Sequence, residues 1–183
     1  MRNVILLISV LLLIPSISGC GTIYGAAVDE RKLSTIASDH EIKARILQAF
    51  ANDENVGVLK ISVSSYKGHV YLIGEYETWT QRSRAIKIAK KQKGVKRLTK
   101  YLLKENPKSR CDYTKNVELT AKVKAKLIGD KGIWSTNIDV KTMQCITVLW
   151  GLVGSKTEKK KAIAHAKSVA GRKKVKSFLK VQK

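Results

Sequence analysis

An internal repeat constrains the fold of this 183-residue chain more than any other feature. When the sequence is shifted by 77 residues without a gap, identical residues of the two halves coincide. The pairs include Ala44 with Ala121, Asp53 with Asp130, Ile61 with Ile138, Val63 with Val140, Leu72 with Leu149, Gly74 with Gly151, Ala85 with Ala162, Ala89 with Ala166, Gly94 with Gly171 and Leu102 with Leu179. This repeat predicts two copies of one small domain rather than a single large domain.

Each copy is predicted to begin with a helix. Apolar residues recur at four-residue spacing, at Ile42, Ile46 and Phe50 in the first copy and at Leu119, Val123 and Leu127 in the second. Asp39 and Asn116 precede these stripes, where we expect them to act as helix N-caps.

A hairpin, a second helix and a last strand are predicted to follow. Apolar and polar residues alternate on both sides of a short turn, as at Ile61, Val63, Val70 and Leu72. Small residues such as Ala85 and Ala89 then predict a helix that lies close on a sheet. Gly68 stands in the first hairpin turn, but Cys145 takes its place in the second copy. We therefore expect the second turn to be built differently.

The first nineteen residues have the three-part order of a secretory signal. Arg2 gives a positive start, residues 4–14 are apolar except for Ser9, and residues 15–19 are mostly small. An apolar run of this length is too short to span a bilayer, which takes roughly 20 helical residues. We therefore predict a signal peptide over residues 1–19 and not a transmembrane helix.

The repeat and the signal divide the rest of the chain. We expect a tether over residues 20–38, the first domain over 39–104, a linker over 105–115 and the second domain over 116–183. The linker contains Pro107 and few apolar residues, which is typical of a connecting segment.

The string "ISGC" at residues 17–20 resembles the bacterial lipobox, after which the cysteine becomes the acylated N-terminus of the mature protein. The resemblance implies lipidation of Cys20. Because no Asp follows Cys20, it also implies sorting to the outer membrane, on the periplasmic face. Several acyl chains make such attachment effectively permanent, since each buried CH₂ contributes about 0.8 kcal/mol. The alternative is ordinary cleavage near Gly19, which leaves a free thiol at Cys20.

Two further strings, "ISVSSYKGHVYLIGEY" and "VLWGLVGSKTEKKKAIAHAKSVAG", resemble the BON domain, whose marks are a V-x-L-x-G hairpin and an alanine-rich second helix. Together with the lipobox and the segment "DERKLSTIASD", they make the chain similar to the dual-BON outer-membrane lipoproteins of the DolP family, which are related to OsmY. The resemblance implies an α+β fold of two tandem domains, each a small mixed sheet covered on one face by two helices. It also implies binding of anionic phospholipid through the second domain and support of outer-membrane integrity.

The sequence departs from that family at the residue expected to meet the lipid. The family has an aromatic residue near the start of the first helix of the second domain, but the matching position here is Glu118. We therefore expect the lipid contact to use the nearest apolar residues, Ile133 and Trp134, at the far end of the same helix.

Charge points to an anionic partner. The chain has 36 Lys and Arg residues against 14 Asp and Glu residues, a formal net charge of +22. The second predicted domain is the more basic. Four lysines lie on its first helix or just beside it: Lys115, Lys122, Lys126 and Lys131. Lysines beside an anionic leaflet each contribute about 1 kcal/mol, and an interfacial Trp adds apolar burial.

The same lysines also fit a solvated helix face, with Trp134 covering the edge of its own sheet. The lysine runs at residues 159–161 and 172–174 offer a second anionic contact or, again, solvated helix ends. Nucleic acid suits such a charge in a cytoplasmic protein, but the signal sequence argues against it.

Catalytic and metal-binding patterns are missing from the sequence. The histidines His40, His69 and His165 are far apart, and no HExxH, CxxC or GxSxG pattern occurs. We therefore expect no enzymatic activity, cofactor or metal. Cys111 and Cys145 remain after lipidation of Cys20, and an even pair in an oxidising compartment favours a disulfide over two free thiols.

These observations predict a non-enzymatic lipoprotein that binds anionic lipid such as phosphatidylglycerol and meets envelope-assembly proteins. The alternative is a periplasmic adaptor or chaperone-like module that binds proteins.

Overall fold

The computed structural model describes residues 32–56, 60–171 and 174–182. The predicted signal peptide, Cys20 and most of the predicted tether lie outside these described residues. The first domain contains α3 (Leu33–Ala51), β1 (Ile61–Tyr66), β2 (His69–Tyr76), α4 (Trp79–Lys91) and β3 (Arg97–Lys104). The second contains α5 (Tyr113–Gly129), a short 3₁₀ turn η1 (Ser135–Asn137), β4 (Ile138–Met143), β5 (Ile146–Val153), α6 (Lys156–Ala170) and β6 (Lys174–Val181).

Each domain has a mixed three-stranded sheet, with strand order β1-β2-β3 in the first and β4-β5-β6 in the second. The first two strands of each sheet form an antiparallel hairpin, and the last strand runs parallel to the middle one. Register follows the repeat, since Val63 pairs with Leu72 and Val140 pairs with Leu149. The predicted α+β fold of two tandem domains is confirmed.

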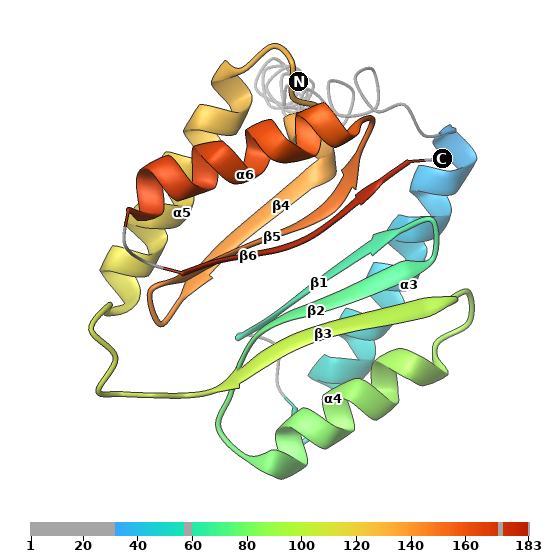
Figure 1. Ribbon diagram of the computed structural model, residues 1–183. Helices are drawn as coiled ribbons and strands as arrows, with labels where there is room; N and C mark the ends of the chain where they lie inside the picture. Colours follow the sequence, from blue (N-terminus) through green and yellow to red (C-terminus); the bar gives the residue numbers. More distant parts are fainter. Residues whose placement is uncertain (1–31, 57–59, 172–173, 183) are drawn as a thin grey trace, which may run out of the picture.

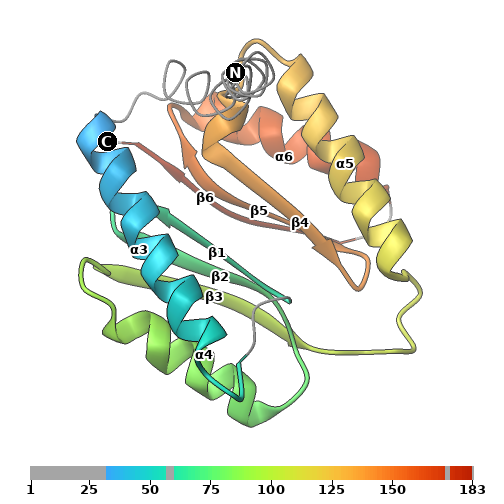
Figure 2. The same ribbon diagram turned by 180° about the vertical axis from the view of Figure 1, so that it is seen from behind.

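The four layers of the molecule are helices, sheet, sheet and helices (Figure 1). Helices α3 and α4 cover the outer face of the first sheet, and α5 and α6 cover the outer face of the second (Figures 1 and 2). The inner faces of the two sheets meet in a third apolar cluster, which we call the interdomain core. Its buried members are Tyr66, Tyr71, Ile73, Met143, Val148, Trp150 and Leu152.

Polar contacts between β1 and β4 fix how the two sheets face each other. The Asp139 carboxylate accepts hydrogen bonds from Ser64 Oγ (2.6 Å) and Tyr66 Oη (2.9 Å). The Lys141 ammonium donates to the Lys60 carbonyl (2.9 Å) and to Ser62 Oγ (3.2 Å). Burial lowers the pKa of Lys141, although the nearby Glu75 carboxylate opposes that shift. These directional bonds set a domain orientation that the sequence did not predict.

The structure overturns the two predicted N-caps. Helix α3 begins at Leu33, inside the predicted tether, so Asp39 lies within the helix. Its carboxylate instead accepts hydrogen bonds from the backbone N–H groups of Lys67 (2.7 Å) and Gly68 (2.9 Å) in the hairpin turn. Asn116 likewise lies inside α5, whose N-cap is Asp112. The predicted N-caps therefore tie each first helix to its own hairpin.

The prediction of a different second turn is also wrong. Lys67 and Gly68 have φ of 54° and 77°, and Gln144 and Cys145 have φ of 49° and 62°. Both turns therefore use two left-handed residues, the arrangement of a type I′ hairpin. Cys145 holds this conformation without being glycine because its N–H donates to Asn116 Oδ1 (3.2 Å) and its sulfur is bonded to Cys111.

The Cys111–Cys145 disulfide joins the linker region to the second hairpin turn, with Cα atoms 5.3 Å apart and a sequence separation of 34. We expect the double variant Cys111→Ser with Cys145→Ser to lower the free energy of unfolding by about 2–4 kcal/mol, because the unfolded chain gains freedom. Guanidinium unfolding of both proteins, each with and without reductant, measures the difference. Reductant should shift only the wild-type midpoint; equal midpoints for wild type and double variant would contradict the prediction.

Candidate functional site

The predicted lysines of α5 do not form one free basic surface. Lys115 Nζ lies 2.7 Å from one carboxylate oxygen of Glu118, and Lys122 Nζ lies 2.6 Å from the other. These two hydrogen bonds lower the pKa of Glu118 to about 2. Lys126 is exposed and has no ion-pair partner among the described residues. Glu118 therefore offsets part of the charge that the sequence assigned to lipid binding.

The prediction that Ile133 contacts lipid is wrong, because its side chain is buried. Only 6% of Ile133 is exposed, and it packs in the core of the second domain with Leu127 and Ile138. A shift by the repeat places Ile133 opposite Val56, which is equally part of the core of the first domain. A side chain committed to this core does not reach a membrane surface.

Trp134, the next residue, is 40% exposed and lines a shallow groove of about 650 Å³ at the end of α5. Ile128, which is 72% exposed, lines the same groove. The cations Lys124 and Lys131 also line it. We call these four residues the Trp134 rim. Sequence analysis identified Lys131 and Trp134 but missed Lys124 and Ile128, whose four-residue spacing beside Leu127 was the available signal.

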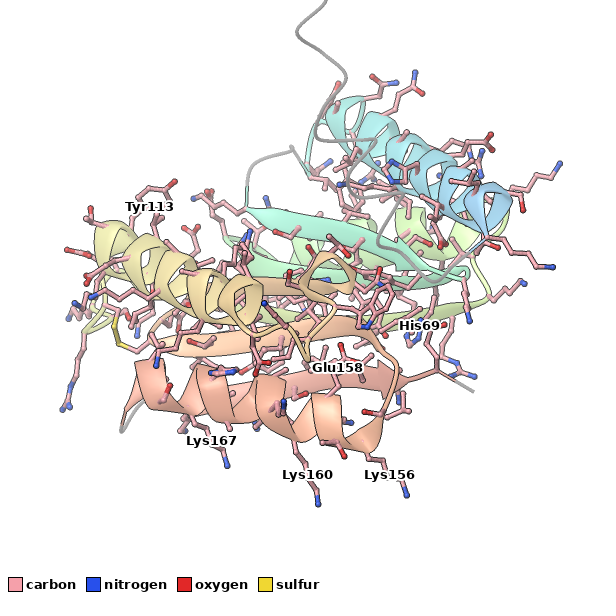
Figure 3. The ribbon with its side chains drawn as sticks, turned by 90° about the horizontal axis from the view of Figure 1, so that it is seen from above. His69, Tyr113, Lys156, Glu158, Lys160 and Lys167 are labelled. Carbon is pink, nitrogen blue, oxygen red and sulfur yellow. A yellow bond between two sulfur atoms is a disulfide. The ribbon has the colours of Figure 1, made fainter. Side chains whose placement is uncertain are left out.

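A buried carboxylate positions the Trp134 backbone. Glu158, labelled at the start of α6 in Figure 3, is buried and accepts hydrogen bonds from the N–H groups of Trp134 (2.9 Å) and Gly154 (2.7 Å). Gln81 occupies the corresponding position in the first domain. Its side-chain oxygen accepts a hydrogen bond from the Glu77 N–H, and its side-chain nitrogen donates one to the Val56 carbonyl. The loop that carries Trp134 is thus held to α6 by side-chain to backbone hydrogen bonds, and the first domain has an equivalent pair of bonds at Gln81.

A second carboxylate holds the other side of this loop. Asp130 accepts from His165 Nε2 (2.9 Å) and from the N–H of Gly132 (2.9 Å). These hydrogen bonds, first that from His165, lower the pKa of Asp130. The loop that carries Lys131 and Trp134 is therefore held in place on both sides, next to the end of α5 that carries Lys124 and Ile128.

A separate apolar surface lies at the start of α5. Tyr113 is 83% exposed and Val117, one turn later, is also exposed. Figure 3 shows the Tyr113 side chain pointing away from the body of the protein. Sequence analysis did not identify this pair, although the four-residue spacing outside the core stripe was visible.

Among residues 32–56, 60–171 and 174–182, no three His, Cys, Asp or Glu side chains are grouped to hold a metal ion. The histidines in β2 and α6 have other partners: His69 Nε2 bonds Thr99 Oγ1 (2.8 Å), and His165 bonds Asp130. Within the same described residues, no helix combines the length and apolar character needed to cross a bilayer.

Comparison with known proteins identifies the repeat. The BON domain family matches residues 38–103 and again residues 115–183. Osmotically-inducible protein Y of Escherichia coli (strain K12) is 31% identical over 162 residues, which cover 86% of this chain and 81% of that protein. A solved structure of CdsD, a structural protein of the type III secretion system of Chlamydia trachomatis, aligns at a TM-score of 0.32 with 14% identity. That alignment covers 78% of this chain and 63% of the CdsD chain.

Proposed function

This chain belongs to the BON domain family, and on that premise we propose that it is a lipoprotein of the bacterial outer membrane that binds anionic phospholipid through its second domain. In this proposal Cys20 carries the acyl chains, the domains face the periplasm, and binding supports outer-membrane integrity. The similarity to osmotically-inducible protein Y supports a role in the response to osmotic stress. The resemblance to the dual-BON lipoproteins of the DolP family supports the anchor. The proposal includes no catalytic role and no cofactor.

The observation that carries the proposal is the Trp134 rim. An indole ring is suited to the bilayer interface, where its apolar body is buried and its N–H stays near water. Ile128 adds an exposed apolar side chain, and Lys124 and Lys131 place ammonium groups beside both. Apolar insertion combined with cations is the pattern that favours anionic over neutral lipid.

Flotation with vesicles tests this function. The unlipidated mature chain should float with vesicles that contain phosphatidylglycerol and should float much less with phosphatidylcholine alone. Trp134→Ala should weaken binding roughly tenfold, because burying a large apolar side chain contributes about 1.5–3 kcal/mol. Trp79→Ala is the matched control, since Trp79 is an exposed tryptophan of the first domain. Equal flotation of the wild type with both lipids would rule the proposal out.

A second candidate function is a periplasmic adaptor that binds envelope-assembly proteins. The exposed pair Tyr113 and Val117 favours it, because an apolar stripe on a helix is a common docking surface for protein partners. Under this alternative, Tyr113→Ser with Val117→Ser impairs partner binding, whereas Trp134→Ala has no effect on it.

A further inference from the structure

We propose that a basic wall built by both domains makes a second contact with the anionic bilayer, in addition to the Trp134 rim, and that Lys115, Lys122 and Lys126 of α5 contribute little. The inference rests on the proposed function and adds a surface to it. The basic wall consists of one side of α6 and the outer edges of β6 and β3: Lys156, Lys160, Lys167, Lys174, Lys176, Lys180, Arg97, Lys100 and Lys104.

The basic wall lacks exposed acids. All nine of its cations are exposed, and no salt bridge joins any of them to a described carboxylate. Strands β3 and β6 contain no Asp or Glu, and the one acid of α6, Glu158, is buried. By contrast, Glu118 pairs with two of the α5 lysines. The positive charge of the wall is therefore less compensated than that of Lys115 and Lys122 on α5.

The three elements of the wall are neighbours. Lys159 of α6 donates to the Leu179 carbonyl of β6 (2.7 Å), which lays the helix along that edge strand. Across the domain boundary, the rings of Tyr101 in β3 and Phe178 in β6 lie 5.7 Å apart. Figure 3 shows Lys156, Lys160 and Lys167 projecting from one side of α6, away from the protein.

Cations of both domains act on the His69 side chain, which is further evidence that β3 and β6 are neighbours. Burial is the first cause that lowers the pKa of His69, and the charges of Arg97 and Lys180 are the next two. One of these cations belongs to β3 of the first domain and the other to β6 of the second. Cations of the two domains therefore act together at the boundary where the wall is continuous.

The chemistry of the wall suits a phosphate-bearing lipid surface. Its ammonium groups stand on long flexible side chains spread over three elements, which favours many dispersed anions over one ligand in a fixed geometry. Lysines on β3 and β6 also discourage pairing between edge strands, but this function does not explain the α6 stripe. Each Lys near an anionic leaflet changes affinity about fivefold, so the attraction accumulates over the wall.

Charge-matched triple variants test the inference in the unlipidated full-length mature chain. One replaces the α6 stripe (Lys156→Gln, Lys160→Gln, Lys167→Gln), one replaces the β3 edge (Arg97→Gln, Lys100→Gln, Lys104→Gln), and the control replaces the α5 lysines (Lys115→Gln, Lys122→Gln, Lys126→Gln). Co-sedimentation with vesicles of phosphatidylglycerol and phosphatidylcholine at low salt gives the affinities. The α6 and β3 variants should bind about tenfold or more weakly, and the control no more than about threefold more weakly. Thermal unfolding checks that every variant folds.

The outcomes separate the inference from the function it rests on. If the wild type shows no preference for phosphatidylglycerol, the proposed function fails. If the wild type binds and the α5 variant loses as much affinity as the α6 and β3 variants, only the basic wall is overturned. Stronger binding to polyglutamate than to the vesicles, lost in the α6 and β3 variants, would assign the wall to an acidic protein partner and would also overturn it.

Discussion

Replacing Gly151 with alanine is expected to lower the free energy of unfolding by more than about 4 kcal/mol, a loss that most domains of this size do not survive. A β-carbon at Gly151 would overlap the backbone carbonyl oxygen of Asn137, which is buried beside it. Gly151 also has φ of 127°, a conformation that residues with a β-carbon rarely adopt. Because the overlapping atom belongs to the Asn137 backbone, no flexible side chain can move aside to relieve the clash.

Gly74 meets the same restriction in the first domain, where a β-carbon would overlap the Lys60 carbonyl oxygen. The glycine of the V-x-L-x-G pattern is thus required because the residue before the hairpin's first strand crosses directly over it. Gly129→Ala is the matched control, since nothing lies within 4 Å of its added β-carbon at the end of α5. We expect the free energy of unfolding of that variant to equal that of the wild type or to exceed it by up to about 1 kcal/mol. Urea unfolding measures all three proteins, and a Gly151→Ala midpoint near that of the wild type would refute the explanation.

The parts of the fold that local periodicity determines could be predicted from the sequence. Ile42, Ile46 and Phe50 form a helix stripe because a helix returns to the same face about every four residues, and all three are buried as expected. The hairpin register follows for a similar reason, since a slip by one residue would turn Val63 and Leu72 away from their core.

The predictions that failed concern side chains whose partners are distant in sequence. An acidic or amide residue before an apolar stripe fits an N-cap, and no local pattern shows that Asp39 instead bonds a turn almost thirty residues away. Likewise, the left-handed conformation of Cys145 depends on Asn116 and Cys111. The burial of Ile133 could have been predicted, because the repeat aligns it with Val56 and a repeated apolar position indicates a core residue.

The packing of one sheet on the other could be predicted only in part. Strands β2 and β5 contain apolar runs in which both alternating faces are buried, and such runs are typical of sheets covered on both sides. The identity of the covering layer depends on contacts such as Ser64 with Asp139, which join residues 75 positions apart. The basic wall could also be predicted only in part. Its lysines can be read from the sequence, but the proximity of β3 and β6, shown by the contact of Tyr101 with Phe178, cannot.

Replacing Trp150 with alanine is expected to lower the free energy of unfolding by about 3–5 kcal/mol and to loosen the two domains from each other. Trp150 is 2% exposed, lies on the central strand β5, and belongs to the interdomain core that also contains Tyr71 and Ile73 of the first domain. Truncation removes apolar burial on both sides of the boundary and leaves a cavity that two separate sheets must close. The remaining polar contacts of Asp139 and Lys141 are exchanged with water at small net cost, so they hold the domains together weakly on their own.

The variant should therefore change the cooperativity of unfolding as well as its midpoint. We expect the wild type to unfold in one transition and Trp150→Ala to unfold in two, one for each domain, when followed by calorimetry. Trp79→Ala is the matched control. Trp79 is 61% exposed and its ring contacts Tyr76 and Arg82, so its truncation should lower the free energy of unfolding by less than about 1 kcal/mol. A single transition with an unchanged midpoint in Trp150→Ala would mean that the coupling of the two sheets does not depend on Trp150.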